Sequence, residues 1–265
     1  MGERSSGSVL GRFFLYALLV WLLAWLPLGL WKGDPDYVLT VVSRGSVERQ
    51  IYQGLLYSGL LFLFLHAWWR HAPERPGKGR AVDLVLHAGL GLVGALGLRL
   101  AMVLLGGRAW PEPSWTASQL LVALLSGLAV AVIEEALFRG FLMGRLAGWT
   151  TPRNALLISS ALFALVHLFR PGSLLFRLAY GLGLFLLALL LGRIAWVKCS
   201  VAASAGFHAG VIWPNLLDPW PGLWPAWWSG WQGEPVSGAL SWLLTLLLWG
   251  QWEWWQRRRE TLAES

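Results

Sequence analysis

Long apolar runs alternate with short polar breaks along the whole chain. As helices, these runs can cross or nearly cross a hydrocarbon core about 30 Å thick. The breaks between them contain Gly, Pro and charged residues, as turns between helices do. The eight predicted segments are residues 13–31, 51–69, 81–105, 117–138, 155–169, 174–192, 201–217 and 238–256.

This pattern predicts an all-α fold, a polytopic membrane helix bundle of about eight transmembrane helices. We treat residues 1–265 as a single integral-membrane domain. The first run is too long for a signal-peptide core and ends without a small-residue cleavage site, so we expect it to remain as the first span. The third run carries a stripe of small residues that admits a close neighbouring helix. The stripe consists of Gly89, Gly91, Gly94 and Gly97.

The composition agrees with a membrane protein. Hydrophobic residues make up 56% of the chain and charged residues 13%, against about 25% charged residues in soluble domains. The net charge of +7 does not indicate nucleic-acid binding, because the basic residues stand singly or in short groups between apolar runs, as topology signals do. The one cysteine, Cys199, excludes a disulfide or a cysteine-based zinc site within the chain.

The Lys and Arg residues near the segment ends are unevenly distributed. With the N-terminus inside, fourteen lie near inner ends and five near outer ends. Inner loops of membrane proteins carry the excess of Lys and Arg, so we expect both termini in the cytoplasm and an integral protein of a bacterial inner membrane. The inner set is Arg4, Arg12, Arg70, Arg75, Lys78, Arg80, Arg139, Arg145, Arg153, Arg193, Lys198 and Arg257 to Arg259, and the outer set is Lys32, Arg44, Arg49, Arg108 and Arg170.

Two adjacent carboxylates, Glu134 and Glu135, follow the apolar run from Leu120 to Ile133. An ionised carboxylate in hydrocarbon is costly unless it is paired, hydrated or protonated. Arg139 lies four residues after Glu135, on the same helix face. One interpretation is a helix end at the inner surface, where Glu135 and Arg139 pair in headgroup water. The other is a functional site inside the membrane.

Two histidines lie in later apolar segments. His167 follows Phe163 by four residues, so the two side chains share a helix face. His208 lies in a run of small residues that lets neighbouring backbones come close. A single intramembrane histidine is more often a hydrogen-bonded core residue than a catalyst. Two on separate segments, together with Glu134, favour a shared polar chamber.

These residues carry a resemblance to a known family. Residues 134–139 match the EExxxR motif of the CPBP family, the CAAX-protease and bacteriocin-processing intramembrane proteases. Residues 163–167 resemble its FxxxH motif, and His208 resembles the histidine of its third motif, usually HxxxN or HxxxD. The resemblance covers about residues 115–217, which we expect to form the catalytic core.

The third motif departs from the family pattern at Ile212, where Asn or Asp is usual. Asn215, seven residues after His208, returns to roughly the same face of a regular helix. Pro214 lies between them and can kink that turn. Asn215 is therefore a candidate substitute for the missing residue.

The resemblance implies a glutamic-type intramembrane endopeptidase that cuts near the C-terminus of a membrane-associated protein or peptide. It implies that Glu134 takes a proton from water, that His167 positions this water, and that His208 donates to the oxyanion. Glu135 and Arg139 are expected to pair and hold the helix end. No cofactor is favoured, and the implied partners are this substrate and the lipid bilayer, without nucleic acid.

Zinc offers another interpretation of the same residues, because two histidines and one carboxylate are a known catalytic ligand set. The ligands would be Glu134, His167 and His208. The chain has no HExxH spacing, and no segment supplies two ligands at helical spacing. We therefore favour the glutamate mechanism.

Two other classes of function stay open at this point. A proton-coupled carrier would use Glu134, Glu135 and His167 as a relay, although the chain shows no inverted repeat. A catalytically silent immunity or scaffold protein would account for Ile212.

Overall fold

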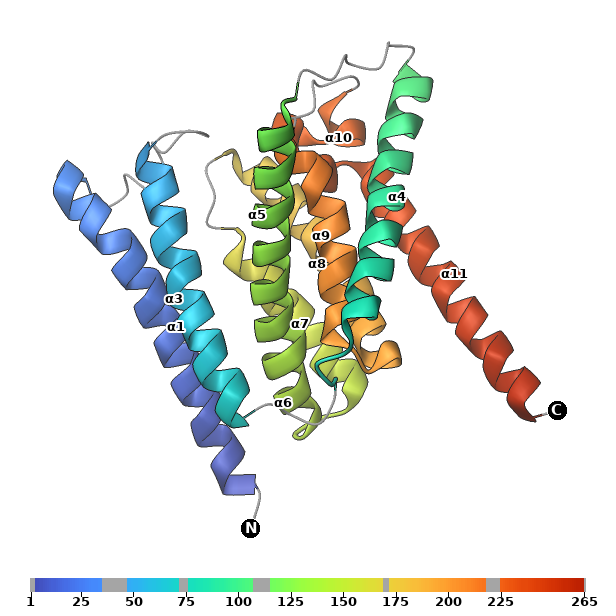
Figure 1. Cartoon of the computed structure of the whole chain (residues 1–265), viewed down its shortest axis with the longest axis horizontal. Coiled ribbons are helices and arrows are strands. Elements are labelled where there is room, and N and C mark those ends of the chain that lie inside the picture. The colour runs from blue at the N-terminus through green and yellow to red at the C-terminus, as the bar shows by residue number, and fades with distance from the viewer. Residues whose placement is uncertain are drawn as a thin grey trace.

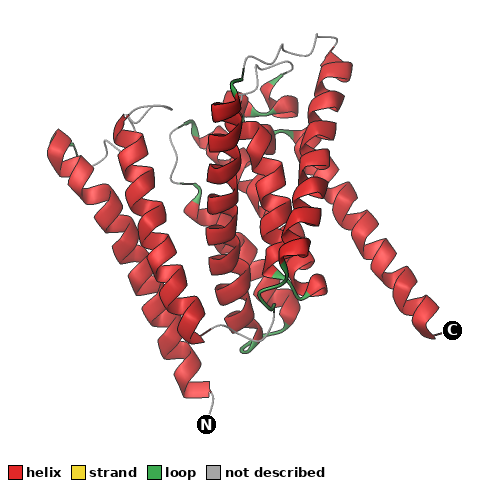
Figure 2. Cartoon of the chain, in the orientation of Figure 1, coloured by secondary structure: helices red, strands yellow, loops and turns green. Residues whose placement is uncertain are grey.

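The computed structural model describes residues 3–34, 47–71, 76–106, 115–168, 172–217 and 225–264, and this part of the chain is helical, with no strand (Figure 2). The all-α prediction is confirmed over these ranges. The long helices are α1 (Glu3–Lys32), α3 (Val47–His71), α4 (Ala81–Gly106), α5 (Ala117–Glu135), α7 (Pro152–Val166), α8 (Leu174–Lys198), α9 (Val201–Leu217) and α11 (Ala239–Glu264). The shorter ones are η1 (Ala136–Met143), α6 (Gly144–Ala147), α10 (Ala226–Ser229), η2 (Trp231–Gly233) and η3 (Pro235–Ser237).

Within the described ranges, four helical stretches are long and apolar enough to cross a membrane. They are Gly11–Lys32, Ala81–Leu105, Ala117–Ala147 and Leu174–Lys198. Large apolar side chains such as Val85 and Leu104 stand exposed on α4, which suits a lipid-facing surface and not a water-facing one. The protein is therefore an integral membrane protein.

Each predicted apolar segment overlaps a long helix, but the predicted end of the fourth segment is wrong. Helical structure does not stop at residue 138 and continues from α5 through η1 and α6 to Ala147. Arg139 made the run look interrupted, because an isolated charge marks a membrane boundary. In the structure, a carboxylate compensates this charge inside the protein.

Hydroxyl side chains begin several of these helices. Thr116 forms a capping box with Gln119 at the start of α5. Thr151 accepts from the backbone of Asn154 at the start of α7, and Ser173 accepts from the backbone of Phe176 at the start of α8. Each cap satisfies a backbone N–H that the first helical turn leaves without an intrahelical partner.

Helices α4 and α9 pack at very short distance because both carry glycine at the contact. A Cβ on Gly91 of α4 would overlap the backbone carbonyl of Phe207, and one on Gly206 of α9 would overlap the carbonyl of Leu84. The predicted glycine stripe is therefore only partly used. Gly89, Gly94 and Gly97 face open space, with nothing within 4 Å of an added Cβ.

Helices α1 and α3 lie side by side at one edge of the molecule, and α11 diverges at the opposite edge (Figure 1). The remaining long helices lie between them. The α1–α3 pair joins this central group through an apolar cluster that includes Phe13, Leu63, Ile133 and Phe141, against which Tyr57 packs. Residue 57 of α3 is thereby held next to the end of α5.

Candidate active site

The acidic pair lies where the helix changes its winding. Glu134 and Glu135 are the last residues of α5, and the next eight residues, Ala136–Met143, form the π-helix η1. Such widened turns are rare and occur frequently at functional sites. The interpretation that the acidic pair marks a helix end is wrong, since the helical stretch runs on to Ala147. Glu134 lies well inside this stretch.

Glu135 and Arg139 form a fully buried ion pair. Their side chains are 0% and 1% exposed, and Arg139 Nη1 donates to Glu135 Oε1 at 2.8 Å. Arg139 Nη2 also donates to the carbonyl of Ala188 in α8 at 3.1 Å, and its guanidinium lies 4.6 Å from the ring centre of Phe163. The interpretation as a surface pair in headgroup water is therefore wrong, and the pair holds α5, α7 and α8 together.

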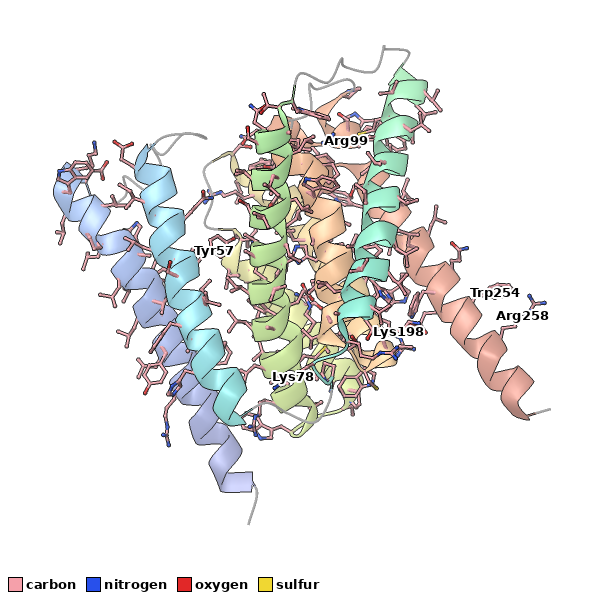
Figure 3. All side chains as sticks on the ribbon, in the orientation of Figure 1. Tyr57, Lys78, Arg99, Lys198, Trp254 and Arg258 are labelled. Atoms are coloured by element: carbon pink, nitrogen blue, oxygen red, sulfur yellow. The ribbon has the colours of Figure 1, made fainter. Side chains whose placement is uncertain are left out.

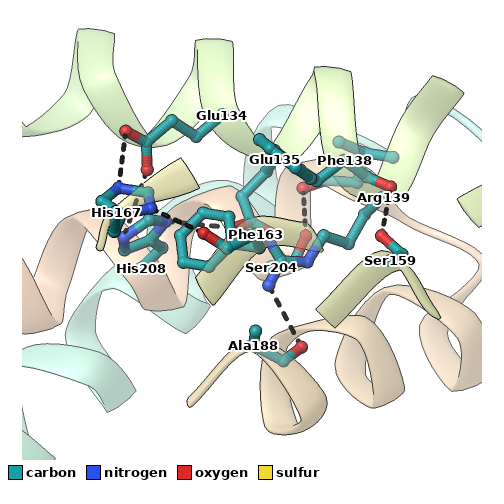
Figure 4. A network of polar contacts seen from close by, with 11 residues as sticks. Glu134, Glu135, Phe138, Arg139, Ser159, Phe163, His167, Ala188, Ser204 and His208 are labelled. Atoms are coloured by element: carbon teal, nitrogen blue, oxygen red, sulfur yellow. Dashed lines mark hydrogen bonds and ion pairs between the residues drawn. The ribbon is translucent and has the colours of Figure 1, made fainter. Parts of the chain in front are cut away.

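His208 of α9 is oriented by the same carboxylate. Its Nδ1 lies 3.0 Å from Glu135 Oε1, and the side chain is buried (Figure 4). An ionised carboxylate only accepts hydrogen bonds, so His208 Nδ1 carries the proton. Its Nε2 faces Glu134 Oε2 at 4.0 Å.

His167 approaches Glu134 from α7. It is the C-terminal capping residue of that helix, and its Nδ1 lies 2.7 Å from the carbonyl oxygen of Phe163. A carbonyl oxygen also only accepts, so His167 Nδ1 is a donor. Its Nε2 faces Glu134 Oε1 at 3.8 Å. Phe163 therefore orients His167 through its backbone.

Glu134 is thus the point on which two oriented imidazoles converge. The separations of 3.8 and 4.0 Å exceed a direct hydrogen bond, so a small outward movement of the imidazoles would admit a water molecule between these groups and the carboxylate. A carboxylate and an unprotonated imidazole nitrogen around one water can take up its proton. The arrangement therefore has the parts for activating water inside the membrane protein.

A cavity of about 1080 Å³ adjoins this cluster. Glu134, His167 and His208 all line it, together with Tyr57, Arg99 and Asn215. The volume is slightly above the range typical of ligand pockets, about 300–1,000 Å³. A peptide segment therefore has room beside the Glu134 carboxylate.

Six of the seven candidate residues named from the sequence come together here, and Asn215 does not join them. It lies seven residues after His208 on α9, which is about 10 Å along a helix axis. Asn215 Nδ2 donates to the carbonyl of Val211 at 3.3 Å, and its Oδ1 lies 3.5 Å from Arg99 Nη2. Asn215 lines the same cavity, but closer to the C-terminal end of α9 than His208 does.

Two residues of the cavity wall were missed by the sequence reasoning. Tyr57 donates to Glu134 Oε1 at 3.1 Å from the distant helix α3, and no local pattern signals this contact. Arg99, 7% exposed, donates to the carbonyl of Pro214 at 2.5 Å. Arg99 had a signal, because an isolated cation in an apolar run marks a functional or structural site. Its position is labelled in Figure 3.

Zinc does not fit this geometry. Tetrahedral zinc with ligand bonds of about 2.0–2.1 Å holds its ligand atoms about 3.3 Å apart, which is less than the 3.8 and 4.0 Å found here. In the part of the chain that the structure describes, no group of three His, Cys, Asp or Glu residues is arranged to hold a metal ion. We therefore derive no step through a metal.

Residues 116–213 match the family model described as "Type II CAAX prenyl endopeptidase Rce1-like". The matched range contains the acidic pair, Arg139 and both histidines of the cluster, and it excludes α1, α3 and α4. No curated protein and no solved structure matches the chain.

Proposed function

We propose that the protein is a glutamic-type intramembrane endopeptidase, because residues 116–213 match the family model of the Rce1-like type II CAAX prenyl endopeptidases (CPBP). Its substrate is a membrane-associated protein or peptide, cut near its C-terminus. One observation carries the proposal: the Glu134 carboxylate lines a large cavity and faces the Nε2 atoms of two oriented histidines.

The first step in this proposal is attack by water. Glu134 takes one proton from a water molecule, while His167 Nε2 accepts a hydrogen bond from it and fixes its position. The oxygen adds to the carbonyl carbon of the substrate and produces a tetrahedral oxyanion. Protein surroundings of low polarity strengthen such charge interactions compared with water.

The second step is collapse of the tetrahedral intermediate. His208, protonated on both nitrogens, donates from Nδ1 to Glu135 and from Nε2 to the oxyanion. Glu134 then passes its proton to the nitrogen of the leaving amine, the C–N bond breaks, and an acid and an amine result. The ion pair of Glu135 with Arg139, at 2.8 Å, keeps the carboxylate in place to support the positive charge of His208.

We further propose a single domain over residues 1–265, with eight spans, a catalytic core at about residues 115–217, and both termini in the cytoplasm of a bacterium. The support is the distribution of positive charge. Lys78 and Lys198 lie toward one end of the bundle and Arg99 toward the other (Figure 3), and the cytoplasmic end carries the excess of Lys and Arg.

The helix ends that line the cavity indicate the side of the membrane from which a substrate enters. Tyr52 and Ser241, near the first turns of α3 and α11, line the cavity together with Arg99 near the last turns of α4. These ends of the helices lie opposite to Lys78 and Lys198. With both termini in the cytoplasm, the cavity therefore occupies the outer half of the bundle, and the cleaved segment is reached from that half.

The test is cleavage of a panel of membrane-associated peptides by purified protein in detergent. Wild type is compared with Glu134→Ala and His208→Ala, with Glu253→Ala and His87→Ala as matched controls. Glu253 pairs with Arg193 away from the cavity, and His87 bonds to the backbone of Asp83. Loss of cleavage in the first two variants alone supports the proposal, and equal activity in all five proteins contradicts it.

Two added arms separate the remaining alternatives. Activity that survives a strong zinc chelator agrees with the glutamate mechanism, and activity that the chelator abolishes and zinc restores contradicts it. If no peptide is cut but a pH gradient drives proton flux into liposomes, the chain acts as a carrier and the endopeptidase proposal fails.

A further inference from the structure

Tyr57 reaches the Glu134 carboxylate from outside the segment that matches the endopeptidase family. Its hydroxyl donates to Glu134 Oε1 at 3.1 Å, across 77 positions of sequence. Helix α3 ends before residue 116, where the family match begins. The contact therefore depends on how α3 packs against α5.

The position of Tyr57 is fixed by packing. Its ring lies against the apolar cluster of Phe13, Leu63, Ile133 and Phe141, which joins α1, α3, α5 and η1. Tyr57 also lines the cavity beside Glu134. One edge of the side chain is thus anchored in the protein core, and its hydroxyl is presented to the carboxylate.

The distances around Glu134 distinguish Tyr57 from the two histidines. Its hydroxyl lies at 3.1 Å, within hydrogen-bond range, whereas the two histidine Nε2 atoms lie at 3.8 and 4.0 Å. A hydrogen bond to an ionised group is among the strong ones. A buried carboxylate without a hydrogen-bond donor would change its side-chain conformation or take up a proton.

We propose that Tyr57 is a positioning residue of the active site: its hydroxyl fixes the plane of the Glu134 carboxylate and keeps it ionised, so that it can take the proton of water. This inference rests on the proposed endopeptidase function. It makes the α1–α3 pair part of the catalytic unit. A version of the chain limited to the family-matched segment would lack this donor.

Other charged or titratable groups near Glu134 must be held constant in any test. They are His167 at the end of α7, His208 on α9, Glu135 and Arg139 along its own helix, and Tyr180 on α8, which lines the same cavity. A Tyr57→Phe substitution changes none of them. It removes one hydroxyl and leaves the ring that packs against the apolar cluster.

The first measurement is the rate of peptide cleavage by Tyr57→Phe over a range of pH. The matched control is Tyr16→Phe on the neighbouring helix α1, whose side chain is 42% exposed and does not belong to the cavity wall. For Tyr57→Phe we expect kcat to fall on the order of tenfold, as for loss of a hydrogen bond to a charged group. KM should change less than about twofold, the ordinary sign that ground-state binding is unaffected.

The pH profile separates positioning from simple structural support. Without the hydroxyl the carboxylate protonates more easily, so the acidic limb of the Tyr57→Phe profile should move to higher pH, while that of Tyr16→Phe should coincide with wild type. An unchanged profile and kcat in Tyr57→Phe would overturn the inference. So would equal losses in both variants.

A second measurement does not need a substrate. Infrared difference spectra of the purified protein report the C=O band of a protonated carboxyl group, and a Glu134→Gln variant identifies the band of Glu134 by its disappearance. We expect this band to appear at higher pH in Tyr57→Phe than in wild type. If the Glu134 band titrates identically in Tyr57→Phe and in wild type, the positioning role of Tyr57 is contradicted, even if cleavage is never detected. Full cleavage by Glu134→Gln would instead contradict the proposed endopeptidase function.

Discussion

At the scale of single residues, one carboxylate oxygen organises the site. Glu135 Oε1 accepts from Arg139 at 2.8 Å and lies 3.0 Å from His208 Nδ1. The adjacent Glu134 lines the cavity instead. Two neighbouring residues of the same type therefore have different tasks, because one faces the packed interior and the other faces the cavity.

Replacement of Glu135 by Gln should destabilise the protein strongly. The change keeps the shape of the side chain but leaves the Arg139 guanidinium, 1% exposed, without its counter-ion. Breaking a buried pair in this way costs about 3–5 kcal/mol. Denaturant unfolding in detergent measures the free energy of unfolding.

The control for this prediction is Glu253→Gln. Glu253 pairs with Arg193, and the two side chains are 24% and 31% exposed. Partly exposed pairs contribute at most about 1 kcal/mol. Equal destabilisation by the two substitutions would contradict the prediction that the buried Glu135–Arg139 pair contributes more to the free energy of unfolding than the partly exposed Glu253–Arg193 pair.

The residue types at the site were predictable, and their partners were not. The motifs indicated Glu134, His167 and His208 because charged or titratable groups stand out in apolar segments. Tyr57 does not stand out, since tyrosine is common near membrane surfaces. Its contact with Glu134 arises only when α3 packs against α5, which nothing near residue 57 encodes.

At the scale of helices, hydrophobic pattern predicted the elements but not their winding or contacts. The continuation of α5 into the π-helix η1 was missed because Arg139 resembles a membrane boundary when its partner is unknown. The glycine stripe on α4 was recognised, yet only Gly91 of the four is at the contact with α9. Small residues permit a close approach, but the partner helix decides which of them is used.

Replacement of Gly91 by Ala should disturb the site through α9. The added methyl group would overlap the backbone carbonyl of Phe207, next to His208. Backbone cannot move aside as a flexible side chain can, so α9 must shift, at a cost of about 1–3 kcal/mol. We expect a lower free energy of unfolding together with slower peptide cleavage.

The matched control is Gly89→Ala, two positions earlier on α4. An added Cβ there meets nothing within 4 Å, and alanine favours a helix over glycine by about 1 kcal/mol. Stability should therefore stay the same or rise slightly. If Gly89→Ala lowered the free energy of unfolding as much as Gly91→Ala, the close contact of α4 and α9 would not be the cause of the destabilisation in Gly91→Ala.

At the scale of the whole molecule, the sequence predicted an all-α membrane protein because composition and segment length are global properties. Such global properties do not predict the cavity, since its wall combines α3, α4, α5, α7, α8, α9 and α11. Orientation in the membrane rests on charge distribution alone. A direct labelling experiment can decide it.

The one cysteine provides this experiment. Cys199 is exposed at the C-terminal end of α8, next to Lys198. With both termini in the cytoplasm, a membrane-impermeant maleimide should label Cys199 only after the cells are permeabilised. The matched variant carries Cys199→Ser and Trp31→Cys, because Trp31 is exposed at the other end of the bundle, and it should be labelled in intact cells.

The reverse labelling pattern would invert the protein in the membrane. The cavity would then lie in the cytoplasmic half, and the cleaved segment of the substrate would be reached from the cytoplasm. The chemistry proposed for Glu134 does not depend on this outcome.

The most direct test of the central claim is the kcat of Glu134→Gln on a cleaved membrane peptide, compared with wild type and with Glu253→Gln. Glutamine matches glutamate in size but cannot take a proton from water. General base catalysis contributes about 10²–10⁴-fold, so we expect kcat to fall by at least about a hundredfold in Glu134→Gln and to stay near wild type in Glu253→Gln. A Glu134→Gln protein that cleaves the peptide at the wild-type rate would contradict the account.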